Sequence, residues 1–186
     1  ISRNMEKIGF EPRFLISASA VQLTFGLPNI YLQHFDKILV YPNEYYSSIT
    51  KQYHKGEVNP RFGIIVLSLD HFMEGYTESD NDSVNLGLHE MAHALRLENI
   101  IRQEEYRFFD ETLVRKLDEY AGRVCRNMDD YGNFFRAYAC TNEHEFFSVA
   151  IENFFERSEL FRNQIPELYT ILTRLLGQDP LKLVKA

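Results

Sequence analysis

His89-Glu90-Met91-Ala92-His93 is the stretch of this sequence that says most about the fold and chemistry of the chain. The pattern H-E-x-x-H on a helix is a signature of zinc-dependent peptidases. Two histidines four positions apart lie one turn apart on the same helix face, so both imidazoles can reach one metal ion at about 2.0–2.1 Å. Glu90 leaves the helix beside them, where its carboxylate can act on a water held by the metal. The pentad therefore predicts a helix that carries part of a hydrolytic zinc site.

The sequence around the pentad predicts an amphipathic helix over residues 83–97, with Ser83 as its N-cap. Its core stripe consists of four apolar residues at helical spacing, Val84, Leu88, Met91 and Leu95. At about 100° per residue, His89 and His93 point away from this stripe, toward a second face that is also partly apolar. Gly87 inside the helix suggests a close approach of another segment. The alternative is an ordinary surface helix whose two histidines bind no metal.

The composition bounds the fold and excludes several classes of function. The chain has 186 residues, of which 45% are hydrophobic and 14% aromatic, which is enough for one domain with a substantial core over residues 1–186. A net charge of −7 without a Lys/Arg cluster argues against nucleic acid as a partner. No apolar run approaches the roughly 20 residues of a membrane span, and no signal-peptide pattern is visible. We therefore expect a soluble, cytoplasmic domain, although a start at Ile1 leaves room for a missing N-terminal segment.

Cys125 and Cys140 are the two cysteines of the chain. They are too few for a disulfide scaffold in a chain that can already build a hydrophobic core. We therefore predict two reduced thiols, typical of a reducing compartment, in preference to a single disulfide bridge.

The remaining pattern predicts a mostly helical α+β domain with a small sheet upstream of the pentad helix. A helix is expected over residues 14–25, with Phe14, Ala18, Val21 and Phe25 on its core face. Two short β-branched runs predict strands at 37–41 and 63–68, and the polar segment 43–61 between them predicts a loop. Apolar spacing and turn residues predict further helices at about 104–126, 142–158 and 166–177.

A hydrolytic zinc site uses three protein ligands, so the pentad needs one more His, Asp or Glu. The segment Glu145–Glu156 is the obvious supplier, because its helix is aromatic over most of its circumference and must be largely buried. Its carboxylates Glu145, Glu152 and Glu156 fall within about 40° of one another at 100° per residue. A solvent-facing strip is the alternative interpretation of these three carboxylates. The competing candidate ligands are His144, Glu143 and His71.

Several segments outside the pentad make a joint pattern that is far more specific than the pentad alone. They are Tyr138–Glu156, Pro166–Tyr169 and Gln178–Pro180, together with Leu39–Pro42, Leu67–Asp70 and Glu74-Gly75 upstream. With these segments the chain closely resembles the Mlc titration factor A family of bacterial zinc metallopeptidases, over about residues 15–182. The resemblance implies a zincin-like metallopeptidase fold, similar to the catalytic domain of anthrax lethal factor.

The same resemblance implies roles for individual residues. In the family a tyrosine seven residues before a glutamate accompanies the pentad, and Tyr138 and Glu145 have that spacing. Glu145 is then the third zinc ligand beside His89 and His93, and Tyr138 hydrogen-bonds the oxyanion on the attacked carbonyl. A packed, half-buried side chain is the alternative role for Tyr138. The sequence departs from the family pattern at Arg96 and at Glu143-His144, which puts contacts around the ligands and the substrate loops in doubt.

The leading hypothesis is a zinc-dependent peptidase with one Zn²⁺ per chain, Glu90 as general base and a peptide or protein as substrate. The family is named for sequestering a transcriptional repressor, so the alternative is a regulatory module that binds a transcriptional regulator or another protein. A purely structural zinc ion is a third interpretation. A structural zinc site is usually closed and four-coordinate, so it fits poorly with a ligand set of two His, one Glu and an open position.

Overall fold

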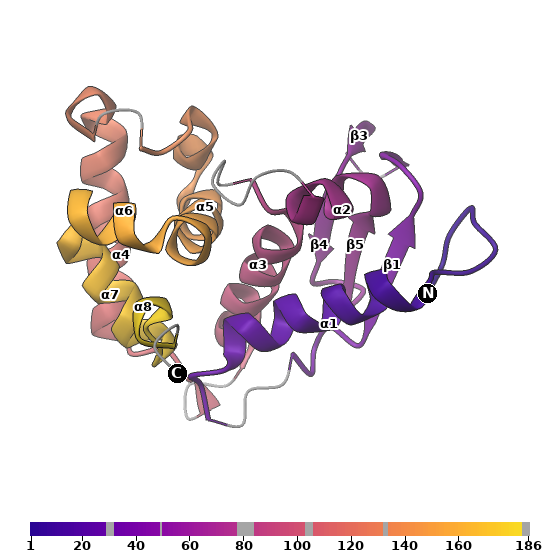
Figure 1. Cartoon of the computed structure of the whole chain (residues 1–186), viewed down its shortest axis with the longest axis horizontal. Helices are drawn as coiled ribbons and strands as arrows, with labels where there is room; N and C mark the ends of the chain where they lie inside the picture. Colours follow the sequence, from indigo (N-terminus) through magenta and orange to yellow (C-terminus); the bar gives the residue numbers. More distant parts are fainter. Residues whose placement is uncertain (29–31, 49, 78–83, 103–105, 132–133, 184–186) are drawn as a thin grey trace.

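A small mixed sheet precedes the pentad helix in the computed structural model, which describes residues 1–28, 32–48, 50–77, 84–102, 106–131 and 134–183 (Figure 1). The strand order is β1–β5–β4, where β1 spans Lys37–Tyr41, β5 spans Ile64–Ser68 and β4 spans Gly56–Asn59. Strand β1 is parallel to β5, and β4 is antiparallel to it, so β4 forms one edge of this sheet. The two predicted strands are confirmed within one residue, as is the mostly helical α+β class with a small upstream sheet.

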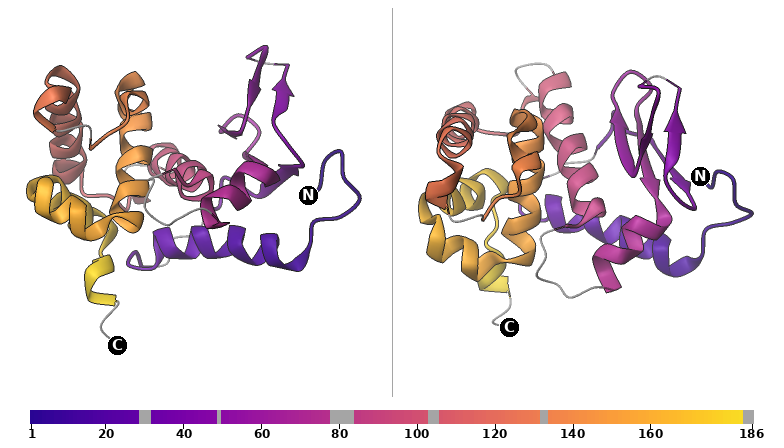
Figure 2. Two further views of the ribbon diagram at one scale, coloured as in Figure 1. Left: turned by 45° about the horizontal axis from the view of Figure 1, so that its top comes forward. Right: turned by 90° about the horizontal axis from the view of Figure 1, so that it is seen from above.

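The prediction of a loop over residues 43–61 is wrong. Besides β4, this segment contains β2 (Tyr45–Ser47) and β3 (Gln52–His54), which pair as an antiparallel hairpin (Figure 2). These strands are only three or four residues long, and all four residues of β4 are partly buried. Strands this short do not provide the four or more residues of alternating apolar and polar character by which a half-buried strand is predicted from sequence.

The pentad helix α3 (Leu86–Ile101) lies between the sheet on one side and helices α4–α7 on the other (Figures 1 and 2). Its N-cap is Asn85, whose side chain accepts a hydrogen bond from the backbone N–H of Leu88 at 3.0 Å. The predicted N-cap, Ser83, lies outside the described residues. Of the predicted core stripe, Leu88, Met91 and Leu95 are buried, whereas Val84 is exposed.

Gly87 on α3 confirms the expected close approach. A Cβ atom at this position would lie 2.6 Å from the ring of Phe72 and 2.9 Å from the hydroxyl oxygen of Ser19. Phe72 belongs to α2 (Leu69–Thr77), and Ser19 belongs to α1 (Phe10–Thr24). Three helices therefore meet at one position that only glycine can occupy without displacing a neighbour.

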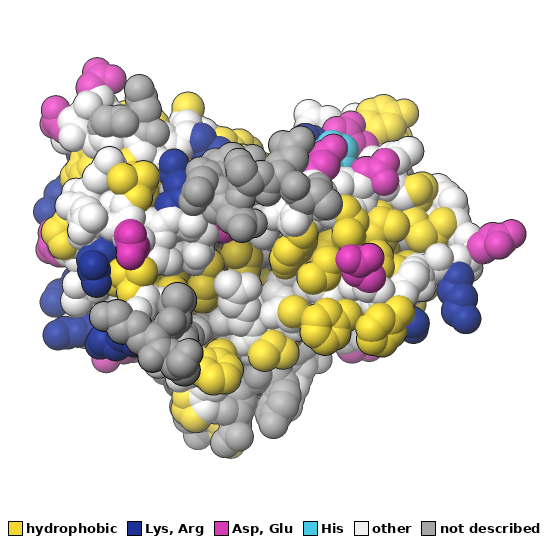
Figure 3. Space-filling model, viewed as in Figure 1, with side chains coloured by type: hydrophobic (Ala, Val, Ile, Leu, Met, Phe, Trp, Pro, Cys, Tyr) yellow, Lys and Arg dark blue, Asp and Glu magenta, His cyan; other side chains and the backbone are white. Residues whose placement is uncertain are grey.

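Helix α1 forms where it is expected, but the prediction of its core face is wrong. Its buried residues are Ile16, Ser19 and Leu23, whereas the predicted face points to solvent through Phe14, Val21 and Phe25. Figure 3 shows hydrophobic side chains on the surface over α1. The buried face includes a serine because the Ser19 hydroxyl lies 2.6 Å from that of Tyr76 on α2, a pairing that apolar periodicity does not reveal.

Five further α-helices follow α3 in the part of the chain that the structure describes. They are α4 (Glu111–Arg126), α5 (Glu143–Glu156), α6 (Ser158–Gln164), α7 (Pro166–Leu176) and α8 (Pro180–Leu183). The predicted start at Glu104 lies outside the described residues. Helix α4 begins later, because Asp110 caps it by accepting a hydrogen bond from the N–H of Leu113. Helix α7 ends as predicted at Gly177, which adopts the left-handed conformation with φ of 63°.

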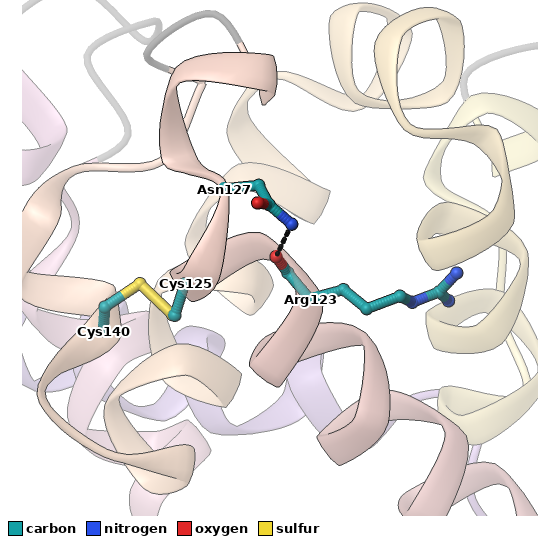
Figure 4. Close-up of a disulfide and its surroundings, with 4 residues drawn as sticks. All are labelled: Arg123, Cys125, Asn127 and Cys140. Carbon is teal, nitrogen blue, oxygen red and sulfur yellow. Dashed lines mark hydrogen bonds between the residues drawn. A yellow bond between two sulfur atoms is a disulfide. The ribbon is translucent and has the colours of Figure 1, made fainter.

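The prediction of two reduced thiols is wrong, because Cys125 and Cys140 form a disulfide bond (Figure 4). Cys125 lies in the last turn of α4, and Cys140 lies in the short 3₁₀ helix η3 (Ala137–Thr141) that precedes α5. The chain turns back between these helices and brings the two Cα atoms within 5.5 Å of each other. Disulfides persist mainly in oxidising environments, so the sequence argument for a reducing compartment no longer holds.

Among the residues that the structure describes, no helix combines the length and hydrophobicity needed to cross a membrane.

Candidate metal centre

Two nitrogen atoms and one oxygen atom, from side chains of two helices, lie close together at one point of the structure. The Nε2 atoms of His89 and His93 are 3.1 Å apart, and each lies 3.1–3.2 Å from Oε2 of Glu145. Three ligands of a tetrahedral zinc ion at about 2.0–2.1 Å are about 3.3–3.4 Å apart, so this spacing fits a zinc ion. Neutral imidazoles facing each other with their lone pairs would repel, and a shared cation removes that repulsion. The donor set therefore fits a metal ion of the zinc type.

Local capping explains why Glu145 is held in position. Helix α5 begins after Asn142, whose side-chain oxygen accepts hydrogen bonds from the backbone N–H groups of His144 and Glu145 at 2.9 and 3.0 Å. Because this cap fixes the first turn of α5, it also fixes the point at which the Glu145 side chain leaves the helix. Helix α5 packs directly against α3, so the carboxylate reaches the two histidines.

Glu152, a second carboxylate of the predicted stripe, binds the other nitrogen of His89. Its Oε1 lies 2.7 Å from Nδ1 of His89, and Oε2 accepts a hydrogen bond from the backbone N–H of Asn85 at 2.8 Å. Nη2 of Arg136 donates to the same Oε1 at 2.6 Å. Glu152 is only 1% exposed, so it does not form a solvent-facing strip. It holds the ring of His89 from behind instead of joining the three converging atoms.

The buried charges shift the pKa values of the converging groups. Burial lowers the pKa of His89, but hydrogen bonds with Glu145 and Glu152 outweigh this effect and raise the pKa to about 10. Burial raises the pKa of Glu145, but its hydrogen bonds with His89 and His93 outweigh it and hold the pKa well below the usual range. The carboxylate is therefore ionised, as a metal ligand must be.

Glu90, the predicted general base, is buried beside the converging atoms. It is 5% exposed, and burial, opposed by nearby His89, raises the pKa of its carboxyl to about 7. The first residue of β4, Gly56, allows this position, because a Cβ atom there would overlap the Glu90 carboxylate. The edge strand of the sheet thus lies directly against the candidate base.

Tyr138, the predicted oxyanion donor, lies in η3 at the same site. Its ring centroid is 6.0 Å from that of His89, and its side chain is half exposed. Burial of its inner part and the charge of Glu145, with which it is hydrogen-bonded, raise the pKa of the hydroxyl well above the usual range. The phenol therefore stays protonated and can donate a hydrogen bond at neutral pH.

A cleft of about 540 Å³ reaches this site, where His89 is the one converging residue among those that line it. Its lining includes His89, Glu90 and Glu152, together with Arg136 and Tyr138. The segment 53–56 and helix α2 also contribute to the lining. Among the described residues, the converging His-His-Glu group therefore lies at the edge of a cavity large enough to admit part of a peptide.

The other candidate ligands lie elsewhere. His71 is in the wall of the cleft, with Nδ1 2.9 Å from Oγ of Ser68 and Nε2 3.6 Å from a carboxylate oxygen of Glu44. His144 and Glu156 are partly buried but are not part of the converging group. Glu143 is largely exposed and makes a long ion pair of 3.9 Å with Arg96.

The ion pair between Arg96 and Glu143 joins two positions at which the sequence departs from the family pattern. Arg96 on α3 is buried, donates to Asp118 on α4 at 2.7 Å and stacks over the ring of Phe147 on α5. Glu143 at the start of α5 meets the same guanidinium. The two departures therefore lie together behind the site, where they link α3, α4 and α5, and they leave the converging atoms untouched.

Comparison with known families agrees with this arrangement. The family described as glucose-regulated metallo-peptidase M90 matches residues 5–176 of the chain. The chain belongs to the M90 family. Similar proteins include Mlc titration factor A of Yersinia pestis (strain Pestoides F) and of Yersinia pseudotuberculosis serotype O:1b (strain IP 31758). Each is 26% identical over an alignment that covers 88% of this chain and 67% of the relative.

Some features of this M90 site were not predicted from the sequence. Glu152 was considered as a ligand, and the sequence signal, its place on one face of α5 with Glu145, was correct even though the contact is with Nδ1 of His89. Arg136 carried no signal, because nothing in its neighbourhood predicts a turn that directs it at Glu152. Gly56 lay in a segment interpreted as loop, so its approach to Glu90 was also missed.

Proposed function

We propose that this M90 chain is a zinc-dependent peptidase with a zincin-like catalytic domain. The observation that carries the proposal is the convergence of His89, His93 and Glu145 beside a cleft, with Glu90 from the same pentad next to them. Zinc held by these three side chains would supply Lewis acidity and would lower the pKa of a bound water to about 7. The metallopeptidase description of the family supports the same class of reaction.

Glu90 is the proposed general base. It is adjacent to the ligand His89 in sequence and lines the cleft, so its carboxylate can take a proton from the attacking water and pass it to the leaving amine. Because Gly56 has no side chain, its backbone can lie next to this carboxylate without a steric clash. Because Glu90 is buried, little water competes for its oxygens.

Tyr138 is the proposed donor to the oxyanion. Its hydroxyl stays protonated, and its side chain forms part of the cleft wall beside His89. A donor placed there stabilises the negative charge that develops on the carbonyl oxygen, an effect typically worth about 2.7–4 kcal/mol. The packed, non-functional role considered for this tyrosine fits less well, because half of the side chain is exposed in the cleft.

An extended peptide is the proposed substrate. Strand β4 forms an edge of the sheet, and Gly56 at its start lines the cleft. Backbone groups at a sheet edge can pair with an incoming extended chain, which would lay a peptide in the cleft.

A peptide library incubated with zinc-loaded protein tests this proposal. We expect cleavage by the wild type and by Glu159→Gln, an exposed control on α6, and a loss of roughly 10²–10⁴-fold for Glu90→Gln with zinc content retained. Absence of cleavage by the zinc-loaded wild type, in conditions where a related active enzyme works, would overturn the proposal.

A second candidate function is binding of a transcriptional regulator. It is favoured by the name of the relatives, Mlc titration factor A, and by the exposed hydrophobic side chains along α1. A regulator as partner would also require the cytoplasmic location predicted from the sequence. The variant Glu90→Gln separates the two functions, because it should abolish hydrolysis and leave protein binding intact.

A further inference from the structure

Two side chains of the site come from the connection between α4 and α5, not from the helices that hold the converging ligands. Arg136 donates to Glu152, which in turn holds His89, and Tyr138 lies beside the ring of His89. Both line the cleft. The backbone position of this connection therefore helps to determine where the oxyanion donor lies, together with the contacts of Tyr138 with Glu145 and His89.

Helix η3, which carries Tyr138, is a short element that packs against α5. Helix η3 has five residues, is of the 3₁₀ type and has no side-chain N-cap. Short 3₁₀ helices have poorer hydrogen-bond geometry than α-helices. Upstream, Arg157 donates to the carbonyl oxygen of Phe134 at 2.8 Å, and Ala139 is fully buried against the core. These contacts fix the backbone at Phe134 and Ala139. The position of the half-exposed Tyr138 side chain also depends on how rigidly η3 is attached to the rest of the protein.

The Cys125–Cys140 disulfide supplies a covalent attachment two residues after Tyr138. It fastens η3 to the last turn of α4, where Asn127 also closes the helix end by donating to the carbonyl oxygen of Arg123 (Figure 4). Both cysteines are partly exposed, so a reductant can reach the bond. Helix α4 is a four-turn element packed against α5 and α7, and so it is a rigid anchor for the short helix.

We propose that the Cys125–Cys140 disulfide positions Tyr138, so that the peptidase is fully active only in its oxidised form. This inference rests on the proposed peptidase function. Reduction by a dithiol transfers two electrons and two protons to the two cysteine sulfurs, breaks the bond between them and leaves the reductant as a disulfide. The ligands on α3 and α5 stay in place, whereas η3 and Tyr138 loosen. Turnover falls, and metal binding does not.

Steady-state kinetics on three forms tests this inference. They are the oxidised wild type, the wild type reduced with a water-soluble phosphine, and the double variant Cys125→Ser/Cys140→Ser. A phosphine avoids added thiols, which would themselves bind zinc; it breaks the disulfide, takes one oxygen atom from water and is oxidised to the phosphine oxide. The chain has two cysteines, so this disulfide is the one bond that is reduced.

We expect kcat to fall at least about tenfold in the reduced and variant forms, with KM and zinc content per chain close to wild type. Reoxidation of the reduced wild type should restore kcat. Equal kcat in oxidised and reduced protein would overturn the inference, and so would a parallel loss of zinc, because the disulfide would then support the metal ligands.

A double-variant comparison separates positioning of Tyr138 from general loosening of the fold. In Tyr138→Phe the donor is already absent, so reduction should change kcat by less than about twofold if the disulfide acts through this residue. The same fold-loss in Tyr138→Phe as in wild type would contradict the proposed route.

Hydrogen exchange measured by mass spectrometry gives a readout that does not depend on cleavage. Reduction should speed exchange of amides in residues 137–142 and leave those of α3 and α5 unchanged. If the zinc-loaded wild type cleaves nothing, the peptidase proposal fails by itself, and the exchange experiment still decides whether the disulfide holds η3. Unchanged exchange at residues 137–142 would overturn the positioning inference.

Discussion

The candidate site joins two regions of different construction. Helices α3 and α5 are long, buried elements whose backbone hydrogen bonds fix His89, His93 and Glu145. The connection between α4 and α5 is built from short 3₁₀ turns and is fastened by a disulfide, and it supplies Arg136 and Tyr138. Under the proposed function, metal binding and stabilisation of the transition state would depend on separate parts of the molecule. Substitutions in the two regions should therefore have separable effects.

Glu145→Ala should have the largest effect, because it removes one of the three converging ligands. We expect apparent zinc affinity to fall by more than the roughly 10–100-fold typical of lost supporting contacts, and hydrolysis to become undetectable. Elemental analysis after dialysis measures the zinc content, with Glu159→Gln on α6 as the control. A variant that keeps one zinc per chain would show that the third ligand lies elsewhere.

Tyr138→Phe tests the second region and should leave the first intact. Removing one oxyanion donor typically lowers kcat by about 10²–10³-fold, and the phenyl ring keeps the packing against His89. Kinetics and zinc content measured on one preparation separate the two effects. The control is Tyr106→Phe, an exposed tyrosine that does not line the cleft. A loss of zinc in Tyr138→Phe would break the separation between the two regions.

Glu152→Gln probes the point at which the regions meet, since Glu152 contacts both His89 and Arg136. The uncharged amide is a weaker acceptor for the imidazole and leaves the guanidinium without its buried counter-charge. We expect roughly 10–100-fold weaker zinc binding, measured by competition with a chelator. Unchanged affinity would mean that the ring of His89 is held well enough by the packing of α3 and α5 alone.

The sequence predicted the first region better than the second, for physical reasons. Helical periodicity places residues on faces, so the pentad and the Glu145–Glu152 stripe could be assigned to opposing helices before any coordinates were known. The resemblance then selected Glu145 among several carboxylates. The connection has no such period, and the resemblance alone pointed to Tyr138. Arg136 and the disulfide depend on how a non-repetitive segment turns back on α4.

The sheet and α1 show two further limits of periodicity. Strands β2–β4 are too short to show alternation, so only β1 and β5, which consist mostly of β-branched and apolar residues, were predicted. On α1 the hydrophobic pattern indicated a core face, but the helix buries the side with Ser19, which bonds Tyr76 and faces Gly87 of the pentad helix. A polar contact and a close helix crossing outweighed apolar area at this interface.

Glu143→Ala should have the smallest effect. Glu143 lies in the first turn of α5, next to the cap that places Glu145, but its side chain is two-thirds exposed and its ion pair with Arg96 spans 3.9 Å. Exposed ion pairs contribute about 0–1 kcal/mol, and Arg96 keeps its shorter bond to Asp118 when Glu143 is removed. We expect the free energy of unfolding, measured by urea denaturation, to change by less than about 1 kcal/mol, with zinc content unchanged. Arg96→Ala should cost more, because it leaves Asp118 unpaired and uncovers Phe147. A large effect of Glu143→Ala on zinc binding would instead mean that this departure from the family pattern acts on the metal ligands through the first turn of α5.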